Sequence, residues 1–152
     1  MNLLFEFITA MVATMGFSLL FNVGKRDLPV CGLIGAIAWV IYKASMIYYA
    51  SPILGCLFAA ASVGITSFIA SRVMKNASTV YIIPGIVPMV PGINVFNTMM
   101  AIQDGDMAKA ADLGIEMLCM AGAIAIGLLI VESFTVFVKT SVLNKIKVKK
   151  RI

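Results

Sequence analysis

The residues best suited to chemistry lie in one apolar stretch, YIIPGIVPMVPGIN at positions 81–94. Proline has no amide hydrogen, so Pro84, Pro88 and Pro91 each leave the carbonyl four residues earlier without its helical donor, and a regular helix is not expected to run through them. Irregular backbone at membrane depth is tolerated only where it is buried in protein or lines a wet cavity. The stretch is therefore typical of a transporter binding site, and a kink that serves packing alone is the alternative.

The chemistry expected here is solute binding. A helix that begins at Pro91 points free amide hydrogens and about half a positive charge toward mid-membrane, which suits a carboxylate. Glycine lets the backbone approach a solute without a Cβ in the way, and freed carbonyls can accept from an ammonium group or bind a coupling cation. We predict a substrate-binding pathway formed by Pro84, Gly85, Pro88, Pro91, Gly92, Asn94, Asn97, Thr98 and Glu116. The alternative for the two asparagines is that they only satisfy broken backbone.

Four carboxylates near the ends of the apolar runs need an explanation, because an intramembrane carboxylate costs roughly 2.5–3.5 kcal/mol on insertion scales. Glu116 would hold a solute ammonium group or carry a proton, and Glu132, Asp104 and Asp106 are predicted gate or coupling residues. The alternatives are a headgroup location for the two glutamates and a turn and a helix cap for the two aspartates.

Two further charges lie close to the predicted outer interface. Glu6 is expected to be a solvated charge at a helix end. Lys43 lies among Trp39, Tyr48 and Tyr49, where it would snorkel to the headgroups, with a role in solute binding as the alternative.

The composition identifies the class of protein. Hydrophobic residues make up 61% of the chain and charged residues 12%, against about 25% charged in soluble domains. Histidine is absent, and the three cysteines stand singly in apolar runs, so neither a metal site nor a cofactor is expected, and the chain is not expected to be an enzyme. Basic residues gather at membrane edges, which argues against nucleic acid as a partner.

These properties predict an all-α integral membrane protein with about five transmembrane helices in one domain, 1–152. The approximate spans are 3–23, 28–49, 51–73, 78–103 (broken by the Pro/Gly tract) and 106–138, followed by a basic cytoplasmic tail, 139–152. An N-terminus outside and a C-terminus inside would place every Lys and Arg except Lys43 and Lys109 on the inner side. The tail either touches anionic membrane lipids or acts only as a topological anchor.

Several segments carry a family resemblance: FNVGKRDLP, YIIPGIVPMVPG, the following QDGDMAKA and the glycine-rich last helix. On these segments the chain resembles the threonine/serine exporter (ThrE) family, in its small-subunit, YjjB-like form. The resemblance implies a larger YjjP-like membrane subunit as partner, and export of threonine and serine or, in two-subunit members, of dicarboxylates such as succinate. It also implies that the prolines and glycines of positions 84–92 are motif positions.

An odd number of crossings fits one half of an inverted-repeat transporter, since a related half fused ahead of it would be inverted. The expected function is therefore a subunit of a secondary exporter for a small carboxylate solute, within a hetero-oligomer of the cytoplasmic (inner) membrane. The alternatives are an accessory or structural membrane subunit and a self-associating pore.

Overall fold

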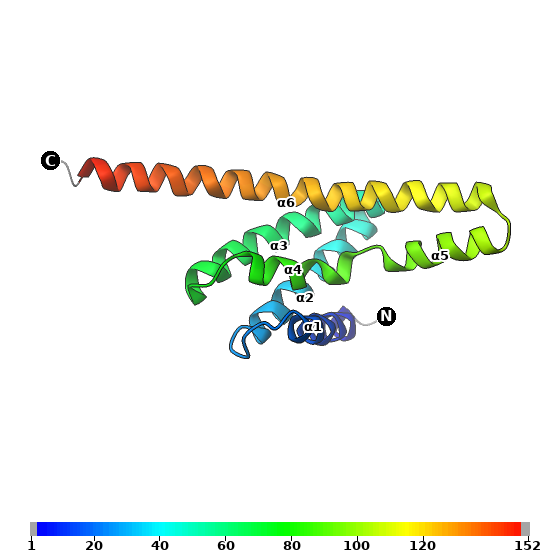
Figure 1. The fold of residues 1–152 in the computed structure, drawn as a ribbon, viewed down its shortest axis with the longest axis horizontal. Helices are drawn as coiled ribbons and strands as arrows, with labels where there is room; N and C mark the ends of the chain where they lie inside the picture. The colour runs from blue at the N-terminus through cyan, green and yellow to red at the C-terminus, as the bar shows by residue number, and fades with distance from the viewer. Residues whose placement is uncertain (1–2, 150–152) are drawn as a thin grey trace.

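The computed structural model describes residues 3–149, and the side chains of residues 3–137. Within these residues all regular structure is helical (Figure 1), in the order α1 Leu3–Leu20, α2 Leu28–Tyr49, α3 Pro52–Met74, α4 Thr79–Ile86, the 3-10 turn η1 Val87–Met89, α5 Gly92–Gln103 and α6 Met107–Lys149. The predicted all-α fold class is confirmed. The side chains of the predicted tail, 139–152, lie outside the described residues.

Four helices, α1, α2, α3 and α6, are each long and apolar enough to cross a membrane. The segment Thr79–Met89 and α5 meet the same criterion together and are bent by 47° at the break between them. The described part of the chain therefore offers four spanning helices, or five if the bent pair is one span. This confirms the prediction of about five spans with a broken fourth, and the chain is a multi-pass membrane protein.

Helix boundaries follow local sequence signals. Pro29 and Pro52 lie in the first turns of α2 and α3, where the amide hydrogen that proline lacks would have no helical acceptor. Gly105, with φ +78°, turns the chain between α5 and α6. Asp106 accepts a hydrogen bond from the backbone N–H of Lys109 at 3.0 Å, so it caps α6 as its sequence position suggests.

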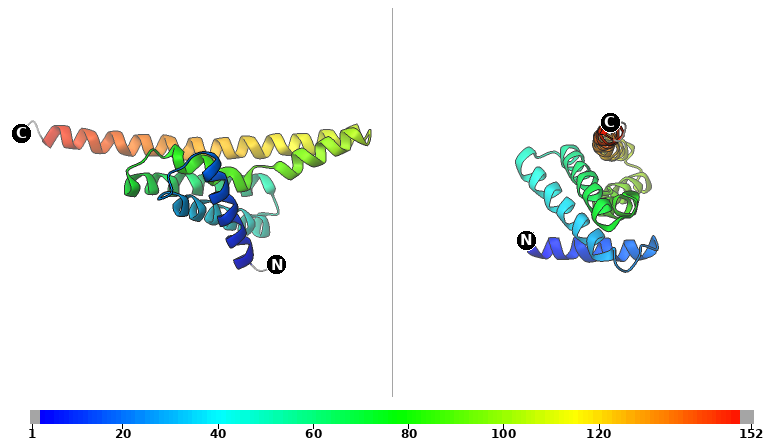
Figure 2. Two further views of the ribbon diagram at one scale, coloured as in Figure 1. Left: turned by 60° about the horizontal axis from the view of Figure 1, so that its bottom comes forward. Right: turned by 90° about the vertical axis from the view of Figure 1, so that its left-hand side faces the viewer.

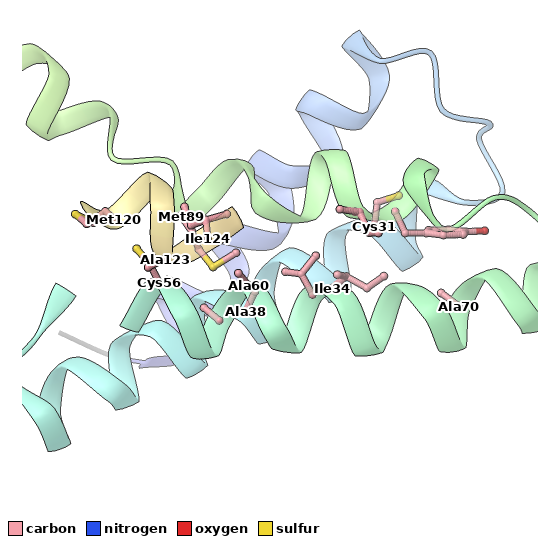
Figure 3. Packing of buried hydrophobic residues seen from close by; sticks show 14 residues of the cluster. Cys31, Ile34, Ala38, Cys56, Ala60, Ala70, Met89, Met120, Ala123 and Ile124 are labelled. Atoms are coloured by element: carbon pink, nitrogen blue, oxygen red, sulfur yellow. The ribbon is translucent and has the colours of Figure 1, made fainter. Parts of the chain in front are cut away.

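Small residues set the spacing between the helices. A Cβ on Gly127 of α6 would come within 2.7 Å of the Leu57 carbonyl of α3, and one on Gly64 of α3 within 2.9 Å of Val131. Close backbone approach of this kind drives helix association in membranes. The core that results is built from α2, α3, α4, η1 and α6 (Figure 3); the residues labelled there are Cys31, Ile34, Ala38, Cys56, Ala60, Ala70, Met89, Met120, Ala123 and Ile124.

The helices do not share one direction. In Figure 1, α6 lies across the view with α3 beside it, while α1 is seen end-on. In the right-hand view of Figure 2, α6 is end-on and α1 lies across, so the two helices run in different directions. α5 packs only against α6 among the described helices, and this hairpin extends beyond the rest of the bundle. Much of the hairpin surface is therefore left uncovered by this chain.

The helix continues further into the proline tract than the sequence predicts. Pro84 lies inside α4 and Pro88 inside η1, and the chain leaves helical geometry only at Val90 and Pro91, directly before α5. The expectation that no regular helix runs through the whole tract is confirmed, since α4 ends at Ile86 and the chain is broken before α5. Pro84 alone is accommodated within α4.

Candidate functional site

The three carbonyls that lose helical donors to the prolines each accept a replacement hydrogen bond. The Cys31 thiol of α2 donates to the Val80 carbonyl, with sulfur and oxygen 3.7 Å apart. The N–H of Val87 donates to the Pro84 carbonyl, and the N–H of Val90 donates to the Val87 carbonyl at 3.3 Å. The broken backbone is thus satisfied from within the chain, as buried polar groups in membranes require. A solute ammonium group or a cation that binds these carbonyls would have to share them with the donors they already have.

The first half of the broken span, α4 and η1, is packed inside the bundle. Tyr81 and Pro84 are fully buried. A Cβ on Gly85 would meet Ile34 of α2 and Val63 of α3 at 3.0 Å, so the side chains of two neighbouring helices occupy the space that this glycine leaves. The contacts of Gly85 are those of a packing glycine, and its place in a solute pathway stays a prediction.

The second half, α5, is open. A Cβ on Gly92 would meet no atom within 4 Å. Asn94 and Thr98 are half-buried against α6: the Asn94 amide nitrogen lies 3.6 Å from the Met120 sulfur, and the Thr98 hydroxyl donates to the Asn94 carbonyl at 2.7 Å. Asn97 is exposed. The first turn of α5 therefore combines free space with polar side chains.

The surface of α5 mixes one amide with large apolar groups. Ile93, Phe96 and Met99 are 77%, 62% and 66% exposed, and Asn97 lies on the same short helix. Apolar side chains suit lipid or a protein partner, whereas an amide facing lipid is costly. This combination indicates that part of α5 meets a partner protein or water.

The predicted carboxylates are distributed over separate places. Glu116 is half-buried and lies within electrostatic range of Tyr42 on α2; Asn94 contacts Met120, one turn further along α6, and no hydrogen bond joins Glu116 to Asn94 among the described residues. Asp104 is the C-cap of α5 and Asp106 caps α6, so both lie in the turn at the far end of the hairpin. They are therefore remote in sequence and along the helices from the break at Pro91.

Glu132 lines a cavity of about 550 Å³ between α3, the α3–α4 connection and α6, together with Arg72, Ser71 and Asn76. The described residues include no ion pair between Glu132 and Arg72. The Arg72 guanidinium instead lies 5.0 Å from the centre of the Phe68 ring. The cavity lining is mostly apolar, with Glu132 and Arg72 as its charged members, and the gate or coupling role of Glu132 stays a prediction.

A buried polar cluster at the same end of the bundle was not predicted. Asp27 is 7% exposed; one carboxylate oxygen accepts from the Tyr81 hydroxyl at 2.7 Å and the other from the Asn76 amide at 2.8 Å. The cluster ties the α1–α2 and α3–α4 connections to the first turn of α4. The three residues are 49 and 54 positions apart in sequence, so only the charge of Asp27 at the start of a span hinted at it.

A second polar cluster, the Glu6–Trp39–Lys43 cluster, links α1 to α2. The Glu6 side chain is 12% exposed and accepts a hydrogen bond from the Trp39 indole N–H at 3.1 Å, and Lys43 Nζ lies 3.6 Å from the same oxygen. Glu6 is thus largely buried, and the expectation of a solvated helix-end charge is wrong. Both residues border an open groove of about 380 Å³, to which the broken span contributes Pro88.

The structure thus brings Gly92, Asn94 and Thr98 together at the start of α5 and separates them from Glu132 and from the aspartates of the turn. Among residues with described side chains, no three His, Cys, Asp or Glu residues are grouped so that they could hold a metal ion. Binding of a solute near the break stays a prediction.

Comparisons with known proteins identify the family. The model of the family described as "Threonine/Serine exporter, ThrE" matches residues 6–134. An uncharacterized protein of Haemophilus influenzae is 24% identical over 103 residues, which cover 67% of this chain and 34% of that protein, so the match spans about a third of the length of this curated relative. No solved structure matches. The chain belongs to the threonine/serine exporter family.

Proposed function

We propose that the chain is a small, YjjB-like subunit of a secondary exporter that moves a small carboxylate solute, either a threonine/serine-type amino acid or a dicarboxylate such as succinate, out of the cell. The observation that carries this proposal is the broken span: its first half packs against α2 and α3, and its second half begins at an uncovered glycine beside polar side chains. Membership in the exporter family supports the same conclusion.

The start of α5 is the proposed carboxylate site. The amide hydrogens in the first turn of a helix lack acceptors four residues earlier, and together they present about half a positive charge. The N–H of Gly92 already donates to the Val90 carbonyl at 2.7 Å, so the amides of Ile93 and Asn94 would receive the solute oxygen. Gly92 leaves room for its approach, and the Asn94 side chain supplies a further donor. Glu116, on the helix that packs against α5, would provide the acidic counterpart for an amino-acid ammonium group.

A larger YjjP-like membrane subunit is the proposed partner. The matched segment is about a third of the length of the Haemophilus influenzae relative, so a longer protein of this kind has room for a second half. The uncovered faces of α5 and α6 would meet that half, and the exposed Asn97 would face it or the solute pathway. An inverted repeat of two such halves is the arrangement that an odd number of spans favours.

The proposed location is the cytoplasmic membrane, with the N-terminus outside and the C-terminus inside. The hydrogen bond between Asp27 and Asn76 joins the α1–α2 and α3–α4 connections, so the two lie at the same end of the bundle. The Lys and Arg residues around both connections favour the inner side for that end. Labelling with a membrane-impermeant thiol reagent in cells, after removal of native cysteines, tests it. Asn2→Cys should react and Lys147→Cys should not, and the reverse pattern would contradict the orientation.

Efflux from vesicles that contain this chain with and without its larger partner tests the function. Saturable efflux that requires both chains is the expected result. Leakage from this chain alone that does not saturate would indicate a self-associating pore, and no effect in either case would indicate an accessory subunit.

The substitutions Gly92→Val and Asn94→Ala then test the site. Neither replaces a residue that fills the bundle core, since Gly92 faces open space and Asn94 contacts a methionine sulfur. Both should slow export and weaken solute binding in complexes that assemble normally. Unchanged export kinetics in both variants would contradict the site.

A further inference from the structure

We propose that the Glu6–Trp39–Lys43 cluster is a solute subsite beside the broken span, and that it selects solutes with one ammonium group and one carboxylate. The inference rests on the proposed transport function and deepens it, because it names the charges that choose between the two solute classes. The cluster lies on α1 and α2, apart from the predicted pathway residues of α5.

The two charges are held in place without being tightly closed on each other. Lys43 Nζ is 3.6 Å from Glu6 Oε2, whereas a charge-assisted N–H···O bond is about 2.7–2.9 Å long. The Trp39 indole N–H fixes that same oxygen at 3.1 Å. The Lys43 side chain is 35% exposed, and an ammonium group has three donors. The ion pair therefore keeps hydrogen-bonding capacity for a ligand.

The surroundings suit a small solute. The groove has a volume of about 380 Å³ and is bordered by Thr9 and Ala13 of α1, by Trp39 of α2 and by Pro88 of the broken span. Ionisable groups within membrane spans are expensive, and by default they mark a substrate or ion pathway. Because Pro88 belongs to η1, a solute in this groove would touch the element that leads into the break before α5.

The pattern of charge discriminates between solutes. An amino acid can place its carboxylate on Lys43 and its ammonium group on Glu6, with the Trp39 ring face, which already attracts the Lys43 cation at 5.5 Å, as a further contact. A dicarboxylate can satisfy Lys43 with one end, but the other end would then lie close to the Glu6 carboxylate. Repulsion between like charges is a common means of excluding a wrong ligand.

A purely structural role for the same pair would be to clamp α1 to α2, and a charge swap separates the two roles. In the double variant Glu6→Lys, Lys43→Glu, a clamp is restored because the opposite charges still face each other. A subsite is not restored, because the solute groups meet reversed charges and the Trp39 N–H no longer has its carboxylate partner.

The experiment measures export of L-threonine, L-serine and succinate from vesicles that contain the chain and its partner subunit. Glu6→Gln should raise the apparent KM for both amino acids about tenfold and improve succinate export relative to threonine. Lys43→Gln should raise the KM for all three solutes. The charge-swap variant should regain the part of the thermal stability that depends on the ion pair, but not the KM of the parent. Lys109→Gln removes an exposed positive charge elsewhere and serves as the matched control, with an unchanged KM.

Parental KM values in Glu6→Gln and Lys43→Gln, or recovery of both stability and KM by the charge swap, would overturn the subsite while leaving the exporter function intact. Preference of the parent for succinate over both amino acids would also overturn it. Failure of the parent to move any of the three solutes would instead contradict the proposed function, and with it the subsite.

Discussion

The two halves of the broken span have opposite environments. In α4 and η1, Tyr81 and Pro84 are fully buried. Each carbonyl that lacks a helical donor because a proline stands four residues later accepts a hydrogen bond from another group. Among the described helices α5 contacts only α6, a Cβ on Gly92 would meet no described atom within 4 Å, and Asn97 is exposed among apolar side chains. The first half is therefore buried in the bundle, and the second half is accessible to a solute or a partner.

This difference shows that the Pro-Gly repeat is not one device used twice. The glycine of the first repeat, Gly85, admits two neighbouring helices, whereas the glycine of the second, Gly92, has nothing against it. We therefore propose that the solute binds at the second half, whereas the first half packs against α2 and α3.

The same substitution at the two glycines should produce the largest contrast. In Gly85→Val, added atoms would meet Ile34 and Val63 where a Cβ alone already lies at 3.0 Å, and overpacking of this kind destabilises by about 1–3 kcal/mol. Gly92→Val should leave the folded chain as stable as the parent, although it should impair export. Thermal unfolding in detergent measures the contrast, and equal stability of the two variants would remove the distinction between the halves.

A smaller loss of stability is expected when the Asp27–Asn76–Tyr81 cluster at the start of α4 is disrupted. Tyr81→Phe removes a donor to the buried Asp27 carboxylate and should destabilise the chain by about 1–2 kcal/mol. Tyr48→Phe is the matched control, because Tyr48 is 84% exposed. A loss of stability that is the same in both variants would show that the Asp27–Tyr81 hydrogen bond does not anchor α4.

Removal of the Cys31 thiol, which replaces the missing helical donor to Val80, should have the smallest effect on stability. Cys31→Ala should cost about 0.5–1 kcal/mol of stability in the parent, since it leaves the Val80 carbonyl without that donor. In a Pro84→Ala background, residue 84 regains an N–H that can donate to Val80, so the same substitution should cost less. This double-mutant cycle isolates the coupling between the thiol and the proline. Equal costs in the two backgrounds would mean that Cys31 only fills space.

The parts of the fold that could be predicted from sequence are those set by local composition. Long apolar runs gave the spans, Pro29 and Pro52 marked helix starts, and Asp106 was recognised as a cap. The path through Pro84 could not be predicted, because its solution depends on Cys31, a residue 49 positions from Val80. The packing role of Gly85 depends likewise on Ile34 and Val63 of other helices.

The candidate site divides in the same way. Asn94 and Thr98 were placed correctly on the first turns of the helix after Pro91, since a helix start is a local signal. Whether they bind a solute stays a prediction. The burial of Glu6 and the Asp27 cluster were missed, because each depends on side chains that come from distant positions and on the crossing of α1 over α2.

Thiol accessibility along the broken span tests the contrast between its halves most directly. The chain for this measurement carries Cys31→Ser, which keeps a donor for Val80, and Cys56→Ala and Cys119→Ala, and it is assembled with its partner. A charged, water-soluble thiol reagent should modify Asn94→Cys and Asn97→Cys, and transported solute should slow the reaction. Met89→Cys, whose parent residue is 3% exposed, should stay unmodified. Modification of Met89→Cys at the same rate as the two α5 positions, or no modification of α5, would contradict a buried first half and an accessible second half.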